Sequence, residues 1–206
     1  MTDTAPPRRH LLVRNADFRA LWISGTAGVF GNAVTAVALP VVAAVELNAS
    51  NFEVAALAGM VFLPWLLFGL VIGVWVDRLP RKPVILWSLA VRVAVLLTLP
   101  LAYWLGMLTT VHLFAVAFAA GLTSVFFNLA DTALVQQAVS RHELVEGNGL
   151  MTGSGAAADA AGRSLAGWLT TIAGASNSLL VQVGASLVSL AAVSRLKVQE
   201  VKLAKT

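Results

Sequence analysis

Residues 69–82 read Gly69-Leu-Val-Ile-Gly73-Val-Trp-Val-Asp77-Arg78-Leu-Pro-Arg81-Lys82, and they join two long apolar segments. Gly69, Gly73 and Asp77 are four residues apart, so on a helix they share one face. Two glycines on one face predict the close approach of another helix. The charged residues that follow favour one of two interpretations. They form a latch between helix pairs, or they mark the cytoplasmic side.

The composition outside this stretch is that of a membrane protein. The chain has 206 residues, of which 58% are hydrophobic and 12% charged, and its mean hydropathy is +0.83. A soluble domain has about twice that charged fraction, roughly 25%. There is no cysteine, which excludes a disulfide framework and a thiolate metal site. We therefore expect an integral membrane protein whose first partner is the lipid bilayer.

The basic residues divide the chain into two sides. They lie before the first apolar segment and after the second, fourth and last segments, at Arg8, Arg9, Arg14, Arg19, Arg78, Arg81, Lys82, Arg141, Arg195, Lys197, Lys202 and Lys205. None lies in the gaps after the first, third or fifth segments. By the positive-inside rule, both termini are expected in the cytoplasm. This distribution indicates no nucleic-acid partner.

The apolar segments predict six membrane-spanning helices, because a span needs about 20 apolar residues. The expected spans are residues 18–45, 53–76, 83–104, 111–137, 148–173 and 178–194. Residues 1–17 form a cytoplasmic tail, residues 18–194 the transmembrane domain, and residues 195–206 a second cytoplasmic tail. An all-α fold is expected, since a helix satisfies its own backbone in lipid. The glycines at 25, 28 and 31 predict close packing of the first span.

Four charged residues lie within the predicted spans and are candidates for a cavity or a coupling site: Arg92, Asp131, Asp159 and Arg163. Arg92 either lines a cavity or pairs with the charged loop or Asp131, or it extends to the near interface. Asp159 and Arg163 can pair across one helical turn, either as a proton-coupling or substrate site or as a self-neutralising pair near the cytoplasmic end. Asp131 is either a coupling group or an anchor at a helix end.

Other chemistry has little support in the sequence. Asn32 and Asn128 are possible polar residues of a cavity. The three histidines are far apart in the sequence, so no metal site is expected, and no cofactor-binding motif is present. No nucleophile constellation or nucleotide-binding loop occurs, and we expect that the protein is not an enzyme.

One motif resembles a known family. Gly73-x-x-x-Asp77-Arg78-x-x-Arg81-Lys82 is similar to the signature loop between helices two and three of the major facilitator superfamily. Residues 15–22, 38–40, 126–134, 141–148 and 162–167 look like its drug- and siderophore-efflux branch, the macrolide and enterobactin exporters. Pro80 and Arg163 depart from that pattern, since they replace a glycine and the proline of a motif associated with antiport.

The resemblance covers nearly the whole chain but only the N-terminal, six-helix half of the family's fold. It implies two inverted three-helix repeats in the cell membrane, the inner membrane of a bacterium. It implies an antiporter that exports small amphipathic molecules and is driven by a proton gradient. It also implies that Asp77 holds the outward-open state by contacting the opposite half.

Two alternatives differ in class. The chain is a truncated or split half-transporter that is inactive alone, with residues 195–206 as the start of an inter-domain linker. Otherwise it is an accessory membrane subunit, or a protein that dimerises. The partner is then a second six-helix half or a second copy.

Overall fold

The computed structural model describes residues 11–140 and 143–196, and this part of the chain is all helical. Its elements are α1 (Leu11–Arg14), α2 (Ala16–Val41), a π-helical turn η1 (Val42–Glu46), α3 (Asn51–Arg78), α4 (Arg81–Trp104), α5 (Thr110–Ala138), α6 (Leu144–Ile172) and α7 (Ala175–Ser194). The basic residues at 8, 9, 141, 197, 202 and 205 lie outside the described residues.

Five of the described helices are long and apolar enough to cross a membrane: α2 with η1, then α3, α4, α5 and α7. The sixth long helix, α6, has 29 residues but a lower hydropathy. Glycine, alanine, serine and threonine replace large apolar side chains along much of it. The fold is therefore that of a multi-pass helical membrane protein.

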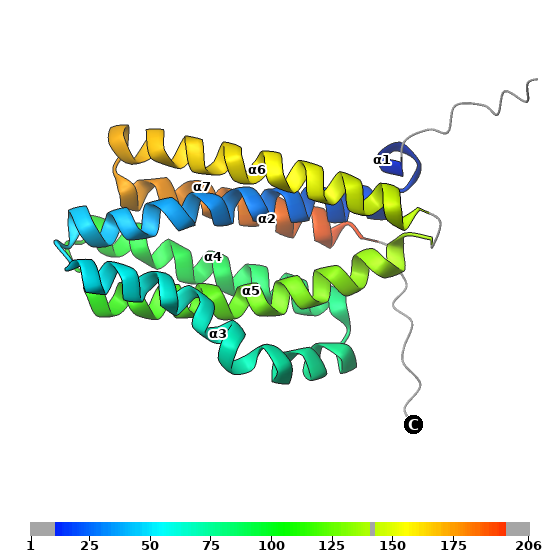
Figure 1. The fold of residues 1–206 in the computed structure, drawn as a ribbon, viewed down its shortest axis with the longest axis horizontal. Helices are drawn as coiled ribbons and strands as arrows, with labels where there is room; N and C mark the ends of the chain where they lie inside the picture. The colour runs from blue at the N-terminus through cyan, green and yellow to red at the C-terminus, as the bar shows by residue number, and fades with distance from the viewer. Residues whose placement is uncertain (1–10, 141–142, 197–206) are drawn as a thin grey trace, which may run out of the picture.

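The helices form an elongated bundle whose long members run side by side (Figure 1). α2 packs mainly against α6 and α7, α5 packs against α3 and α4, and α4 packs against α7. The short connections alternate between the two ends of the bundle (Figure 1). We call the end that holds α1, the α3–α4 connection and the last residue of α7 the basic end, after Arg14, Arg78, Arg81, Lys82 and Arg195.

Local sequence signals set the helix ends. Asn15 accepts a hydrogen bond from the Phe18 amide at the start of α2. Ser50 and Glu53 form a reciprocal capping box at the start of α3, which satisfies two backbone donors that the helix leaves free. Pro64 lies inside α3, which bends along its length (Figure 1), because proline removes a backbone donor and crowds the preceding turn.

Close backbone approaches occur at two glycines on different helices. A Cβ atom on Gly121 of α5 would lie 2.3 Å from the Val61 carbonyl oxygen of α3, and one on Gly162 of α6 would lie 2.5 Å from the Phe30 carbonyl oxygen of α2. Only glycine allows these distances. These two contacts bring α3 onto α5 and α6 onto α2.

The glycines that open residues 69–82 do not act in this way, and the prediction of a close helix on their face is wrong for the described chain. A Cβ atom on Gly73 would meet no atom within 4 Å, and one on Gly69 would meet only Trp65 of its own helix. Leu70, between them, is 90% exposed. A glycine pair permits close packing, but it creates none where no neighbouring helix reaches that part of α3.

Candidate functional site: a charged cavity between the helices

The signature loop is short and lies at the basic end. α3 ends at Arg78, α4 begins at Arg81, and Asp77 and Arg78 are exposed. Lys82 donates from Nζ to the Ser194 carbonyl oxygen at 3.0 Å and to the Leu196 carbonyl oxygen at 2.7 Å. A cation at the carboxyl end of a helix satisfies free carbonyls and complements the helix dipole. Lys82 thus fixes α4 to the end of α7.

The other loop residues make fewer contacts. Arg81 Nε is buried and has no hydrogen-bond partner. Within residues 11–140 and 143–196, the two ion pairs are Arg14–Glu143 and Arg163–Asp159, so neither Asp77 nor Arg78 is in one. The latch interpretation of Asp77 stays a prediction, since the group that it would meet is not in this part of the chain.

A polar layer crosses the bundle halfway along α4, and Arg92 is its centre. The side chain is 1% exposed. Its Nη2 donates to Ser124 Oγ at 2.6 Å, its Nε to Thr123 Oγ1 at 3.3 Å, and its Nη1 to Asn32 Oδ1 at 3.5 Å. The guanidinium carbon lies 5.7 Å from the centre of the Phe127 ring, within the range of a cation–π contact.

This geometry decides between the interpretations of Arg92. A side chain with 1% exposure does not extend to the interface, so that interpretation is wrong. Neither ion pair of the described residues includes Arg92, so the expected pairing with the loop or with Asp131 is also absent there. The hydroxyl groups of Thr123 and Ser124 on α5 accept hydrogen bonds from the Arg92 guanidinium instead. The cavity interpretation remains.

Asp159 and Arg163 form the ion pair that their spacing predicts. Arg163 donates from Nε to Asp159 Oδ2 at 2.8 Å and from Nη2 to Oδ1 at 3.1 Å. Both side chains are about half exposed in the isolated chain. The pair lies in the middle of α6, because that helix begins at Leu144. The expected position near the cytoplasmic end is wrong, since α6 starts four residues before the predicted span.

Asp131 is buried on α5, at 8% exposure, within the apolar cluster nearer the basic end. Its Oδ1 has no hydrogen-bond partner. A Cβ atom on Gly25 of α2 would lie 3.9 Å from its other oxygen. A buried carboxylate without a partner is unfavourable for folding, so Asp131 is a poor anchor and a candidate for a functional group.

The polar layer includes a residue that the sequence reasoning missed. Gln182 of α7 is 1% exposed; its Nε2 donates to Asn32 Oδ1 at 3.4 Å, and its Oε1 has no partner. The sequence carries a signal for it, because a glutamine inside an apolar span is as unusual as an asparagine there. Ser124 and Thr123 gave weaker signals, since serine and threonine are common in membrane helices.

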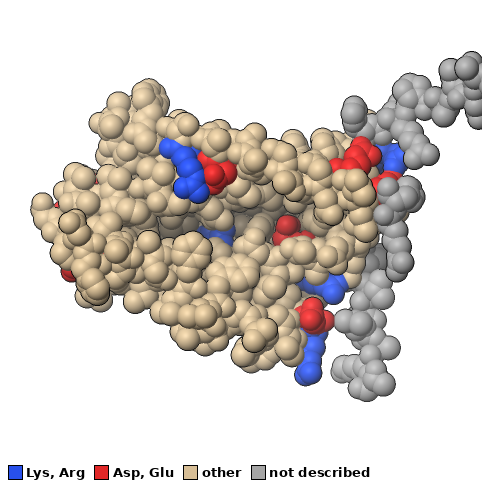
Figure 2. All heavy atoms as spheres, in the orientation of Figure 1, with Lys and Arg blue, Asp and Glu red and all other residues tan. Residues whose placement is uncertain are grey.

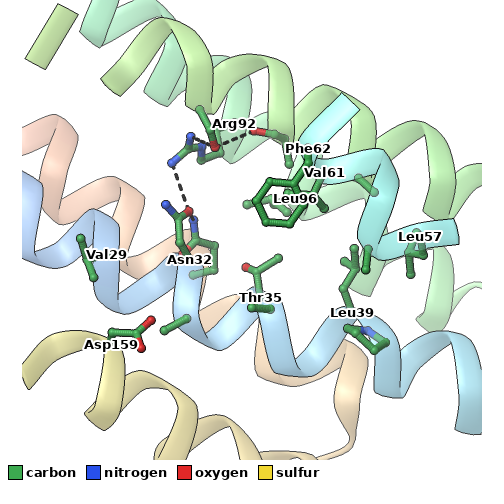
Figure 3. Close-up of a pocket in the computed structure, with 18 of the residues that line it drawn as sticks. Val29, Asn32, Thr35, Leu39, Leu57, Val61, Phe62, Arg92, Leu96 and Asp159 are labelled. Atoms are coloured by element: carbon green, nitrogen blue, oxygen red, sulfur yellow. Dashed lines mark hydrogen bonds between the residues drawn. The ribbon is translucent and has the colours of Figure 1, made fainter. Parts of the chain in front are cut away.

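These residues meet at a cavity of about 530 Å³ between α2, α3, α4, α5, α6 and α7. One wall is polar and contains Asn32, Arg92, Ser124, Asn128, Asp159, Arg163 and Gln182. The other is apolar and contains Leu39, Leu57, Val61, Phe62, Trp65 and Leu96. Figure 3 shows Arg92 and Asn32 pointing toward one another, with Phe62, Leu96 and Val61 beside them and Asp159 on α6. Figure 2 shows positive and negative side chains inside a hollow on this face.

The cavity is large enough for a small organic molecule, since ligand sites are commonly 300–1,000 Å³. Its charged lining residues are two arginines and one aspartate. Among the described residues, no group of three histidine or acidic side chains could hold a metal ion. Fold and site together define a multi-pass membrane protein with a partly polar internal cavity, the architecture expected of a small-molecule transporter.

The family can now be stated. Residues 21–206 match the family model described as Major Facilitator Superfamily, so the chain belongs to that superfamily. Members of this family are membrane transporters, which agrees with the bundle and its cavity. Comparisons with curated proteins and with solved structures give no match.

Proposed function

We propose that the protein exports small amphipathic molecules across the cell membrane in exchange for protons. The observation that carries this is the cavity, which places a charged polar wall next to an apolar wall inside a member of a transporter family. An amphipathic molecule satisfies both walls at once. The direction of transport and the antiport rest on the resemblance of residues 15–22, 126–134 and 162–167 to the efflux branch.

α6 is part of the proposal as the sixth span. Its 29 residues extend about 43 Å at 1.5 Å per residue, which exceeds the roughly 30 Å of a hydrocarbon core. It runs beside α2 and α7 (Figure 1) and contacts α2 closely at Gly162. Its ion pair faces the cavity, where charge is tolerated within a membrane. With six spans, both termini lie on one side, the basic side, which we assign to the cytoplasm.

The packing supports two inverted repeats. Exchanging α2 with α5, α3 with α6, and α4 with α7 leaves the main contacts unchanged. The α2–α6 contact becomes α5–α3, α2–α7 becomes α5–α4, and α4–α7 remains itself. A pattern with this symmetry is expected when two three-helix units have the same fold and opposite orientation.

The charged groups then have distinct proposed roles. Asp77, with Gly73, Arg78, Arg81 and Lys82, forms the latch loop at the basic end. Asp131 is the proposed proton-coupling carboxylate, because it is buried without a partner for Oδ1. The Asp159–Arg163 pair and the amides of Asn32 and Asn128 line the substrate cavity.

A partner is supported by an open face of α6, which consists of small exposed residues at regular spacing: Gly149, Gly153, Ala157, Ala160, Ser164 and Gly167. A Cβ atom at Gly149, Gly153 or Gly167 would meet no atom within 4 Å. Small residues three and four apart allow membrane helices to pack closely. This face supports pairing with a second six-helix half or with a second copy, and it equally suits a half-transporter or an accessory subunit.

Efflux of a fluorescent dye from cells that express only these 206 residues tests the proposal. Efflux is measured with and without a protonophore, and an Asp77→Asn chain with equal membrane insertion is the control. We expect gradient-dependent efflux that the control loses. Absence of efflux from a chain that is correctly inserted would reject self-sufficient transport and favour the half-transporter or the subunit.

A further inference from the structure

The geometry points to an organic anion as the substrate class, with an acidic head group bound at Arg92 and an apolar body along Phe62 and Leu96. This inference rests on the proposed function for the cavity being a transport site. It adds the charge of the substrate, which neither the family nor the fold determines.

The first observation is a buried cation without a counter-ion. Arg92 is 1% exposed, and its three hydrogen-bond acceptors, Thr123, Ser124 and Asn32, are all neutral. Neither ion pair within residues 11–140 and 143–196 includes it. A charge inside a membrane protein is normally paired or faces a water-filled cavity, because isolated burial is strongly unfavourable. Arg92 therefore faces the cavity with no negative partner among the described residues.

The second observation is spare donor capacity. A guanidinium has five N–H groups, and three hydrogen bonds of Arg92 are present. The bond to Asn32, at 3.5 Å, is the longest of the three. Asn32 Oδ1 also receives the Gln182 amide at 3.4 Å. An acidic oxygen that replaced Asn32 Oδ1 would gain both donors, and charged hydrogen bonds are about twice as strong as neutral ones.

The third observation is the charge of the cavity as a whole. The charges in its lining are Arg92, Arg163 and Asp159, so the lining has an excess of one positive charge. The ion pair on α6 neutralises itself, which leaves Arg92 as the unbalanced group. The apolar wall begins next to it, at Leu96 on the next turn of α4 and at Phe62 on α3 (Figure 3). The head and the body of an amphipathic anion thus find adjacent sites.

The test uses two dyes that differ by one acidic group. 1-Anilinonaphthalene-8-sulfonate is an anion, N-phenyl-1-naphthylamine is its neutral counterpart, and both fluoresce in apolar surroundings. Binding to the purified full chain in nanodiscs is measured for the wild type and Arg92→Gln, with empty nanodiscs subtracted. We expect Arg92→Gln to weaken binding of the anionic dye about tenfold or more, as loss of a charged hydrogen bond implies. The affinity for the neutral dye should be unchanged.

The matched control is Arg195→Gln, which removes one positive charge from an exposed site outside the cavity. It should change the affinity for the anion by less than about threefold, because the charge that it removes does not line the cavity. The inference would be overturned if Arg92→Gln weakened the binding of both dyes equally, or weakened the binding of neither dye. So would an Arg195→Gln variant that weakens binding of the anion as much as Arg92→Gln does.

If Arg92→Gln does not fold, a competition experiment on the wild type alone tests whether the cavity prefers anions. Decyl sulfate should displace the anionic dye at a concentration at least about tenfold lower than decyltrimethylammonium does. Equal displacement by the two would overturn the inference. Anion-selective binding without dye efflux from cells would leave the inference intact and reject only self-sufficient transport.

Discussion

Single residues in this chain separate structural roles from functional ones, and Lys82 and Asp77 show this within one loop. Lys82 is bound to two carbonyl oxygens at the end of α7. Asp77 is exposed and is in no ion pair of the described residues. Within this loop, Lys82 therefore stabilises the described helices, whereas Asp77 is exposed where another domain could bind it.

Lys82→Gln should lower the thermal stability of the purified chain, by about 1 kcal/mol, because it removes charged hydrogen bonds at a partly exposed site. Arg78→Gln, an exposed change in the same loop, should leave the stability within about 0.5 kcal/mol of the wild type. Both are measured as the fraction that remains monodisperse after heating in detergent. Equal losses for the two variants would contradict the assignment of Lys82.

Asp131→Asn should keep or raise the thermal stability, by up to about 1–3 kcal/mol, because the change removes a buried carboxylate whose Oδ1 has no partner. The same variant should lose the protonophore sensitivity of efflux. A destabilised Asp131→Asn chain with normal coupling would show that Asp131 is an anchor.

At the scale of helices, α6 has two faces with different roles. Gly162 faces α2 and is buried, whereas Ala157, five residues earlier, is exposed on the open small-residue face. One face stabilises the bundle, and the other is available to a partner.

Substitution by leucine at Gly162 and at Ala157 tests the roles of the two faces separately. Gly162→Leu should destabilise the chain by at least about 1–3 kcal/mol, because its Cβ atom alone would lie 2.5 Å from the Phe30 carbonyl oxygen. Ala157→Leu should leave the melting temperature unchanged and lower efflux or assembly with a partner. Melting curves and efflux from the same preparations check this, and a normal melt for Gly162→Leu would refute the α2–α6 contact.

The sequence could predict five of the long helices because each is a continuous apolar run that ends in polar or charged residues. It also predicts the close packing of the first span, where a Cβ atom on Gly31 would lie 3.0 Å from the Cβ atom of Ala185 on α7, but it could not predict which other glycines allow close packing. Gly69 and Gly73 have the expected spacing but no neighbour, while Gly121 and Gly162 make the contacts. The spacing of glycines is a property of one helix, whereas a close approach also depends on the position of a second helix.

The same limit applies to the site. The sequence predicts Arg92 as a cavity candidate because any charge in a span is unusual. Its actual partners, Thr123 and Ser124, could not be chosen, since they lie on another helix and short hydroxyl residues are common in spans. Gln182 was missed although its polarity was equally visible in the sequence.

At the scale of the whole molecule, the claim on which the rest depends is that α6 crosses the membrane as the sixth span. α6 contributes Asp159 and Arg163 to the polar wall of the cavity, the inverted repeats need it, and the common side of both termini follows from an even number of spans.

The absence of cysteine allows a direct measurement of this claim. Single cysteines are introduced for Leu79, Met107, Val145 and Ala173, which are all exposed near the ends of helices, and are labelled with a membrane-impermeant maleimide in intact and permeabilised cells. Six spans predict labelling from outside at 107 and 173, and labelling only after permeabilisation at 79 and 145. Labelling of 145 and 173 from the same side would show that α6 does not cross the membrane and would contradict the proposed transporter.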